Sequence, residues 1–212
     1  MEGLFAASVY KWLIGVFMFR RVILITGSPC VGKTFVARLL SSKLGACYVD
    51  LTDLALKENM VLGKDEERDS IIVDEARMRR KIREIIEKQS EKDIVIDGHY
   101  AAAVTPKKLV TNIFVLRRNP IELRKLMESR GFSGRKLWEN LASEILDVCL
   151  IEALRVYGKS GICELDVSGK SAEAVVDEIL EILRGQRKCR VGVVDWLGFL
   201  EVEGLLGEYL KI

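Results

Sequence analysis

Eight consecutive residues have the types and spacing needed to hold a phosphate group. The stretch Gly27-Ser28-Pro29-Cys30-Val31-Gly32-Lys33-Thr34 matches the pattern G-x-x-x-x-G-K-[ST] without a mismatch. The two glycines let the backbone approach an anion closely, Lys33 would reach the β- and γ-phosphates, and the Thr34 hydroxyl would ligate Mg²⁺. The pattern therefore predicts a site for a nucleoside triphosphate. The alternative is a glycine-containing turn between a strand and a helix that binds no ligand.

A second group of candidate residues follows the apolar stretch at 93–97, whose sequence is DIVID. Asp97 would end a strand, and ligands bind at the carboxyl ends of parallel strands. If that strand lies beside residues 22–25, Asp97 can hold Mg²⁺ through water. The chain's only histidine, His99, comes two residues later, so an extended backbone would direct both side chains to one face.

We expect His99 to position the attacking water, or to couple the site to a moving lid, rather than to bind metal. The alternative is a structural hydrogen bond. If the neutral imidazole is the working form, activity should fall below about pH 6.5, the value of an unperturbed histidine.

Three arginines, Arg124, Arg130 and Arg135, lie close together in a predicted helix–loop–helix. In phosphoryl transfer enzymes, mobile arginines of this kind close over the triphosphate and neutralise charge in the transition state. The alternative is that they only keep the hairpin soluble.

The elements that would position these residues alternate between strands and helices. We predict strands at 22–25, 47–49, 93–97, 112–116 and 162–167, helices at 33–44, 51–61, 71–90, 121–130, 134–157 and 171–183, and a charged loop at 63–69. Apolar strands separated mostly by helices are typical of a parallel sheet covered on both faces. The prediction is an α/β three-layer fold of the P-loop nucleoside triphosphate hydrolase type, with a parallel five-stranded sheet flanked by helices.

The chain divides into three predicted parts. Residues 1–20 form an apolar N-terminal extension, residues 21–185 the phosphate-loop domain, and residues 186–212 a C-terminal tail expected to fold back as a short helix. The apolar run at 3–19 is too short and too interrupted for a transmembrane span, and it lacks the features of a signal peptide. Translation from Met18, a helix packed on this chain or a partner, and a helix on a membrane surface remain as interpretations.

The bulk composition limits the function further. A length of 212 residues with 49% apolar content suits one domain, and a net charge of +2 argues against a dominant nucleic-acid-binding surface. The five cysteines show no C-x-x-C pair, which favours a reduced, cytoplasmic setting with mostly small core cysteines. Cys30 is either a small loop residue or an oxidation-sensitive one.

Several motifs together resemble one family. Ordinary adenylate kinases follow the third strand with D-G-[FY]-P-R, whereas this chain has Asp97-Gly98-His99-Tyr100 and no arginine. The D-x-H ending is similar to the adenylate kinase isoenzyme 6 family. The stretches that agree with that family in order are GSPCVGKT at 27–34, KDEERDSIIVDEAR at 64–77, VLRR at 115–118, ESRGFSGRKLWENLASEI at 128–145, EALRVY at 152–157, and the Asp195-Trp196 pair.

The resemblance implies a nucleotide kinase with a short lid around Arg130, and Asp97 and His99 as a Walker-B-like pair. It implies an AMP site between the second helix and residues 64–77. The implied ATP contacts are Gly27, Pro29, Val31, Gly32, Lys33, Thr34, Arg117 and Arg130. Two departures stand out, since Cys30 replaces the family's usual glycine and Leu126 stands where an arginine is usual in the helix before the lid.

The resulting hypothesis is an atypical adenylate kinase that transfers the γ-phosphoryl of MgATP to AMP, with Lys33, Asp97, His99 and Arg130 as catalytic residues. The resemblance also implies ATPase activity and a role in small ribosomal subunit maturation, with a platform ribosomal protein and pre-ribosomal RNA as partners. No membrane partner is indicated. The alternatives are an ATP-driven ribosome assembly factor with incidental kinase activity, and a kinase of a non-nucleotide metabolite.

Overall fold

The computed structural model describes residues 20–65, 70–89 and 92–210. Its centre is a five-stranded sheet in which all neighbouring strands are parallel, in the order β2-β5-β1-β6-β7. The strands are β1 (Val22–Thr26), β2 (Cys47–Asp50), β5 (Ile94–Asp97), β6 (Asn112–Arg117) and β7 (Ile162–Asp166). The predicted five-stranded parallel sheet is confirmed. The strands come from apolar runs because both faces of the sheet are covered.

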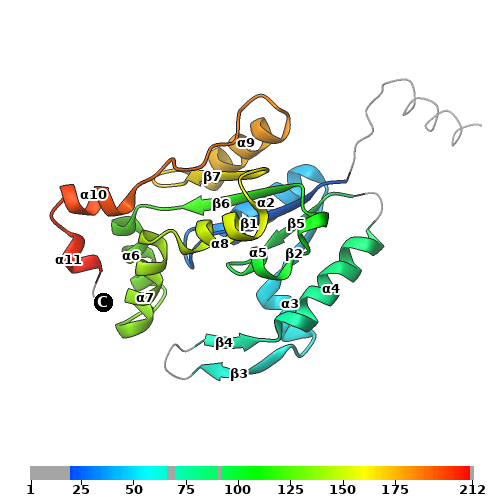
Figure 1. Cartoon of the computed structure of the whole chain (residues 1–212), viewed down its shortest axis with the longest axis horizontal. Coiled ribbons are helices and arrows are strands. Elements are labelled where there is room, and N and C mark those ends of the chain that lie inside the picture. The colour runs from blue at the N-terminus through cyan, green and yellow to red at the C-terminus, as the bar shows by residue number, and fades with distance from the viewer. Residues whose placement is uncertain (1–19, 66–69, 90–91, 211–212) are drawn as a thin grey trace, which may run out of the picture.

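Helices cover both faces of the sheet and give three layers (Figure 1). Successive residues of β1 point to opposite faces, so Ile23 and Ile25 join one buried cluster while Val22 and Leu24 join the other. The first cluster holds side chains of α2 (Lys33–Leu44), α6 (Pro120–Ser129), α7 (Gly134–Ile145), α9 (Ala172–Leu183), α10 (Trp196–Val202) and α11 (Leu206–Tyr209). The second holds side chains of α3 (Leu51–Lys57), α4 (Glu75–Lys88), α5 (Ala101–Val104) and α8 (Val148–Tyr157).

A β-hairpin replaces part of two predicted helices and the predicted charged loop. Strands β3 (Val61–Asp65) and β4 (Ser70–Val73) pair antiparallel outside the main sheet (Figure 1). The predictions of a helix to residue 61 and a helix from residue 71 are therefore wrong at those ends. The three β-branched residues 71–73 favour a strand over a helix. Helix α4 begins only after Asp74, whose side chain accepts a hydrogen bond from the Arg77 N–H at 2.9 Å.

The predicted helix at 134–157 is also two helices. It breaks between α7 and α8 at Asp147, a non-glycine residue with a φ of 59°. The Asp147 carboxylate forms an ion pair with the buried Arg117 guanidinium. This tertiary contact compensates for a backbone conformation that helical periodicity cannot reveal.

The C-terminal tail packs onto the domain through α10 and α11. Asp195 caps α10 by accepting a hydrogen bond from the Gly198 N–H at 2.9 Å, and Trp196 and Leu200 are buried. Within the described residues, no helix is both long and apolar enough to cross a membrane. The interpretations of residues 3–19 lie outside the described part of the chain.

The sequence favoured a reduced setting with mostly small core cysteines, and the structure differs from this expectation at one pair. Cys163 on β7 and Cys189 in the tail form a disulfide, with 26 residues of sequence separation. The tail passes along the edge of the sheet there, since the Glu164 N–H donates to the Arg190 carbonyl at 2.8 Å. The proximity arises from this pairing and not from any cysteine spacing in the sequence.

Candidate active site

The phosphate loop connects β1 to α2 and has the conformation its glycines allow. Gly27 has a φ of 139°, and a Cβ there would lie 2.4 Å from the Leu116 carbonyl oxygen. Gly32 precedes α2 in a left-handed conformation, with a φ of 109°. Both positions therefore require glycine. The N–H groups at the start of α2 remain available for an anion, as the sequence motif predicts.

The Lys33 ammonium lies over the loop and donates a hydrogen bond to the Ser28 carbonyl at 2.8 Å. Burial lowers the pKa of Lys33, and the negative charge of the Asp97 carboxylate opposes that effect. A phosphate group beside the ammonium would stabilise its charged form further. The arrangement suits a residue that neutralises phosphate charge.

Asp97 lies at the end of β5, immediately beside β1, as the sequence argument requires. Ile25 pairs with Asp97 in the sheet register, and the Thr34 hydroxyl donates to Asp97 Oδ2 at 2.7 Å. The carboxylate is only 3% exposed, and burial raises its pKa while the Thr34 hydrogen bond and Lys33 lower it. Its other oxygen, Oδ1, is buried without a hydrogen-bond partner in the described part of the chain.

These residues fit the magnesium ion that accompanies a nucleoside triphosphate. A buried carboxylate oxygen without a hydrogen-bond donor is costly in free energy, and a metal-bound water would supply the missing donor. Among the described residues, no three His, Cys, Asp or Glu side chains cluster closely enough to hold a metal by themselves. Thr34 and Asp97 would therefore hold Mg²⁺ together with the phosphates rather than without them.

His99 lies beyond the end of β5, in a turn rather than on an extension of the strand. Its backbone carbonyl accepts a hydrogen bond from the Thr26 hydroxyl at 3.1 Å, and its ring contacts Tyr100 edge-on. His99 is an exposed residue. Even so, desolvation of its imidazole by surrounding protein atoms, followed by the charge of the Lys33 ammonium, lowers the His99 pKa to about 4. The expected transition at about pH 6.5 is therefore displaced to lower pH.

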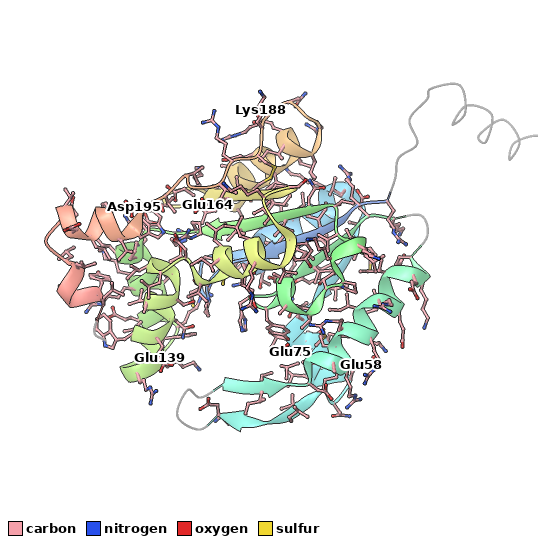
Figure 2. All side chains as sticks on the ribbon, in the orientation of Figure 1. Glu58, Glu75, Glu139, Glu164, Lys188 and Asp195 are labelled. Atoms are coloured by element: carbon pink, nitrogen blue, oxygen red, sulfur yellow. A yellow bond between two sulfur atoms is a disulfide. The ribbon has the colours of Figure 1, made fainter. Side chains whose placement is uncertain are left out.

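The prediction that Arg117 binds the nucleotide is contradicted by its surroundings. The Arg117 side chain is 2% exposed and its guanidinium pairs with Glu144 at 2.9 Å, with Glu164 at 2.6 Å, and with Asp147. Figure 2 shows Glu164 on β7, close to the start of α10. Because these carboxylates take up the guanidinium donors, Arg117 joins β6, β7 and α7 and has no surface for a ligand.

Arg118 was missed by the sequence reasoning and lies beside the phosphate loop. Its Nε donates to the Val31 carbonyl at 3.3 Å, and its Nη1 pairs with Glu122 at 3.0 Å. Adjacent residues at a strand end point to opposite faces, so one arginine of the pair is buried and the other reaches the loop. The sequence signal was the Arg-Arg pair itself, which cannot show which residue has which role.

A cavity of about 280 Å³ opens between the phosphate loop, α6 and the segment after β7. Its basic residues are Arg118, Arg130 and Lys170, and its apolar wall includes Val31, Phe35, Leu126, Val167 and Val175. A larger cavity of about 540 Å³ lies between α9 and residues 186–193 and includes no phosphate-loop residue. The smaller cavity adjoins the phosphate loop and is therefore the candidate nucleotide site.

Of the three candidate lid arginines, only Arg130 lines this cavity. It ends α6, is exposed, and makes no ion pair with other described residues. Arg124 instead pairs with Glu128 and Glu208 and lies over the rings of Trp138 and Tyr209, at 5.0 and 5.4 Å. Arg135 pairs with Glu139 one turn away on α7. Arg124 thus joins the lid helices to the C-terminal tail.

Comparisons with known proteins show the family to which this chain belongs. A family model described as "AAA domain" matches residues 23–147. Two archaeal proteins named "Putative adenylate kinase" are 39% identical (Methanocaldococcus jannaschii) and 41% identical (Pyrococcus furiosus) to this chain. Each alignment covers 82% of this chain, and 92% and 91% of the respective relative. The chain belongs to this adenylate kinase family.

Solved structures support the fold of this adenylate kinase family member. A shikimate kinase from Acinetobacter baumannii superposes with a TM-score of 0.59 at 15% identity, covering 81% of this chain and 97% of that one. A thymidylate kinase from Candida albicans superposes with a TM-score of 0.51 at 16% identity, covering 79% and 92%. These likenesses show a P-loop kinase fold. Membership of the adenylate kinase family makes the chain an enzyme of the nucleotide kinase class.

Proposed function

We propose that this protein transfers the γ-phosphoryl group of MgATP to AMP, giving two molecules of ADP. The observation that carries the proposal is the complete phosphate loop, in which Thr34 is bonded to a buried carboxylate on the adjacent strand. The relatives' names supply the nucleotide class. ATP as donor, AMP as acceptor and Mg²⁺ as cofactor follow from that class together with the geometry of the site.

Catalysis by these residues would consist of positioning and charge neutralisation, since phosphoryl transfer asks little covalent chemistry of the protein. Lys33 would neutralise charge on the β- and γ-phosphates, and Arg130 would cover the transferring group from the end of α6. Asp97 Oδ1 would accept a hydrogen bond from a water molecule bound to the ion. Bound Mg²⁺ would supply positive charge that neutralises the charge developing on the phosphates.

The isoenzyme 6 resemblance adds a second proposed activity, which is ATP hydrolysis in the maturation of the small ribosomal subunit. The sequence following Asp97 supports it, because no arginine stands where ordinary adenylate kinases have one to grip the acceptor. His99, outside the strand and near Lys33, would then position the attacking water. A platform ribosomal protein, pre-ribosomal RNA and a cytoplasmic location belong to this part of the proposal.

A coupled assay of an acceptor panel with MgATP, run with and without ribosomal protein, tests both activities. We expect AMP-dependent ADP formation well above basal hydrolysis, and no transfer by Lys33→Ala with an unchanged circular dichroism spectrum. Lys33 is the first residue of α2 and belongs to neither buried apolar cluster, so its loss should leave the fold intact. Hydrolysis stimulated only by a ribosomal protein would favour the assembly role, and normal transfer by a folded Lys33→Ala protein would refute the kinase.

A further inference from the structure

A tyrosine that belongs to no recognised motif lies between two carboxylates at the ligand edge of the sheet. The Tyr48 hydroxyl is 3.2 Å from Asp97 Oδ2 and 3.3 Å from Asp50 Oδ2. Tyr48 and Asp50 share one face of β2 because they are two residues apart, and the register pairs Asp50 with Asp97 on β5. The sheet itself therefore brings the three groups together.

The other contacts of these residues hold them in place. Asp50 caps α3, because its Oδ1 accepts hydrogen bonds from the N–H groups of Thr52 and Asp53 at 2.9 and 3.1 Å. This leaves only its Oδ2 facing Tyr48. The Arg38 guanidinium lies 5.4 Å from the centre of the Tyr48 ring, where the attraction between cation and ring favours a fixed ring position.

Asp97 Oδ2 thus lies within hydrogen-bond distance of two hydroxyl donors, Thr34 at 2.7 Å and Tyr48 at 3.2 Å. The opposite oxygen, Oδ1, has none among the described residues. A carboxylate held through one oxygen cannot rotate freely, so its second oxygen keeps a fixed direction. The phenol hydroxyl also lies within hydrogen-bond distance of both the Asp97 and the Asp50 carboxylates.

We propose that Tyr48 is a positioning residue that orients Asp97 toward the water shell of the magnesium ion of MgATP. Tyr48 acts through the carboxylate and touches neither the nucleotide nor the ion. The inference rests on the proposed function, because it assigns to Tyr48 a part of the same ATP site. It predicts that Tyr48 contributes to ATP binding only when magnesium is present.

The experiment measures ATP affinity by isothermal titration calorimetry, once with Mg²⁺ and once with EDTA, for wild type, Tyr48→Phe and Tyr100→Phe. Tyr100 is the matched control because its hydroxyl donates to the Leu51 carbonyl at 3.0 Å and touches neither carboxylate. Tyr48→Phe should lose about tenfold in affinity with Mg²⁺, the lower end expected for a hydrogen bond to a charged group. Its affinity in EDTA should match wild type, and Tyr100→Phe should match wild type in both buffers.

The outcomes separate this inference from the proposed function. Wild-type protein that binds no ATP would refute the proposed function and everything resting on it. A different result would refute only the role of Tyr48. In that case, wild type binds ATP more tightly with Mg²⁺ than with EDTA, and Tyr48→Phe has the same ATP affinity as wild type in both buffers. An equal loss in Mg²⁺ and EDTA would also overturn it, because that result describes a general effect on the site. The Mg²⁺ concentration for half-maximal turnover gives a second measurement, which should rise in Tyr48→Phe only.

Discussion

Replacing Arg117 by methionine should destabilise the protein without weakening ATP binding. The substitution removes the guanidinium from between Glu144 and Glu164, whose side chains are 1% and 0% exposed. Removing one partner of a buried ion pair costs about 3–5 kcal/mol because the remaining charge is left uncompensated. A methionine of similar length fills the space, so loss of packing adds little.

The remaining contacts place the expected loss at the lower end of that range. Glu164 still accepts hydrogen bonds from the N–H groups of Gly192 and Val193 at 2.6 and 2.9 Å. Glu144 still accepts them from the Arg118 N–H and the Trp196 indole at 3.0 and 3.1 Å. We expect a loss of about 3 kcal/mol in the free energy of unfolding. In a chain of this size that loss lowers Tm by about 10 °C.

Thermal unfolding followed by circular dichroism, together with ATP titration at 25 °C, tests this expectation. The matched control is Arg118→Met, since Arg118 is 15% exposed and pairs with Glu122, which is 42% exposed. Because water reaches the Glu122 carboxylate, we expect this pair to contribute only about 1 kcal/mol. Arg118→Met should therefore change Tm little while weakening ATP binding. The reasoning is refuted if the Tm of Arg117→Met equals that of wild type. It is also refuted if Arg117→Met binds ATP poorly at a temperature where it is fully folded.

Two other measurements test the electrostatics of the site and the anchoring of the tail. The single His99 Cε1–H resonance should titrate well below 6.5, toward 4. Between pH 6.5 and pH 4, His99 binds a proton in the unfolded chain but not in the folded chain. The free energy of unfolding should therefore fall as the pH drops from 6.5 to 4. An NMR titration midpoint at pH 6.5 would contradict this expectation. Reducing the Cys163–Cys189 disulfide should lower the free energy of unfolding by about 3 kcal/mol. Melting with and without dithiothreitol measures that loss, and an equal response of Cys189→Ser to the reductant would argue against the disulfide as its cause.

The phosphate-binding site was predictable because its residues are contiguous. Gly27 to Thr34 form the loop through local backbone chemistry, so their order in the sequence carries nearly all of the information. Asp97 was also predictable, since an acid at the end of an apolar strand reaches the ligand edge of any parallel sheet. The element order likewise predicted the layered fold, because strands separated by helices pair in parallel.

Local pattern failed where tertiary contacts override it. The sequence around residues 71–73 is compatible with either a helix or a strand. These residues form a strand because they pair with residues 61–65 in the hairpin. Helix α7 stops at a left-handed Asp147 whose carboxylate is drawn to Arg117 from β6. Neither partner is near the other in sequence, so periodicity within one segment carries no trace of the interaction.

The sequence by itself determined the phosphate loop, the acid beside it and the class of fold. Only the tertiary structure decided which of two adjacent arginines lies beside the phosphate loop. Arg117 and Arg118 are identical in type and differ by one position, yet one is buried among three carboxylates and the other reaches the loop. The same holds for Tyr48, which meets Asp97 only because β2 pairs with β5. Burial and strand register are properties of the assembled sheet, so no local motif can encode them.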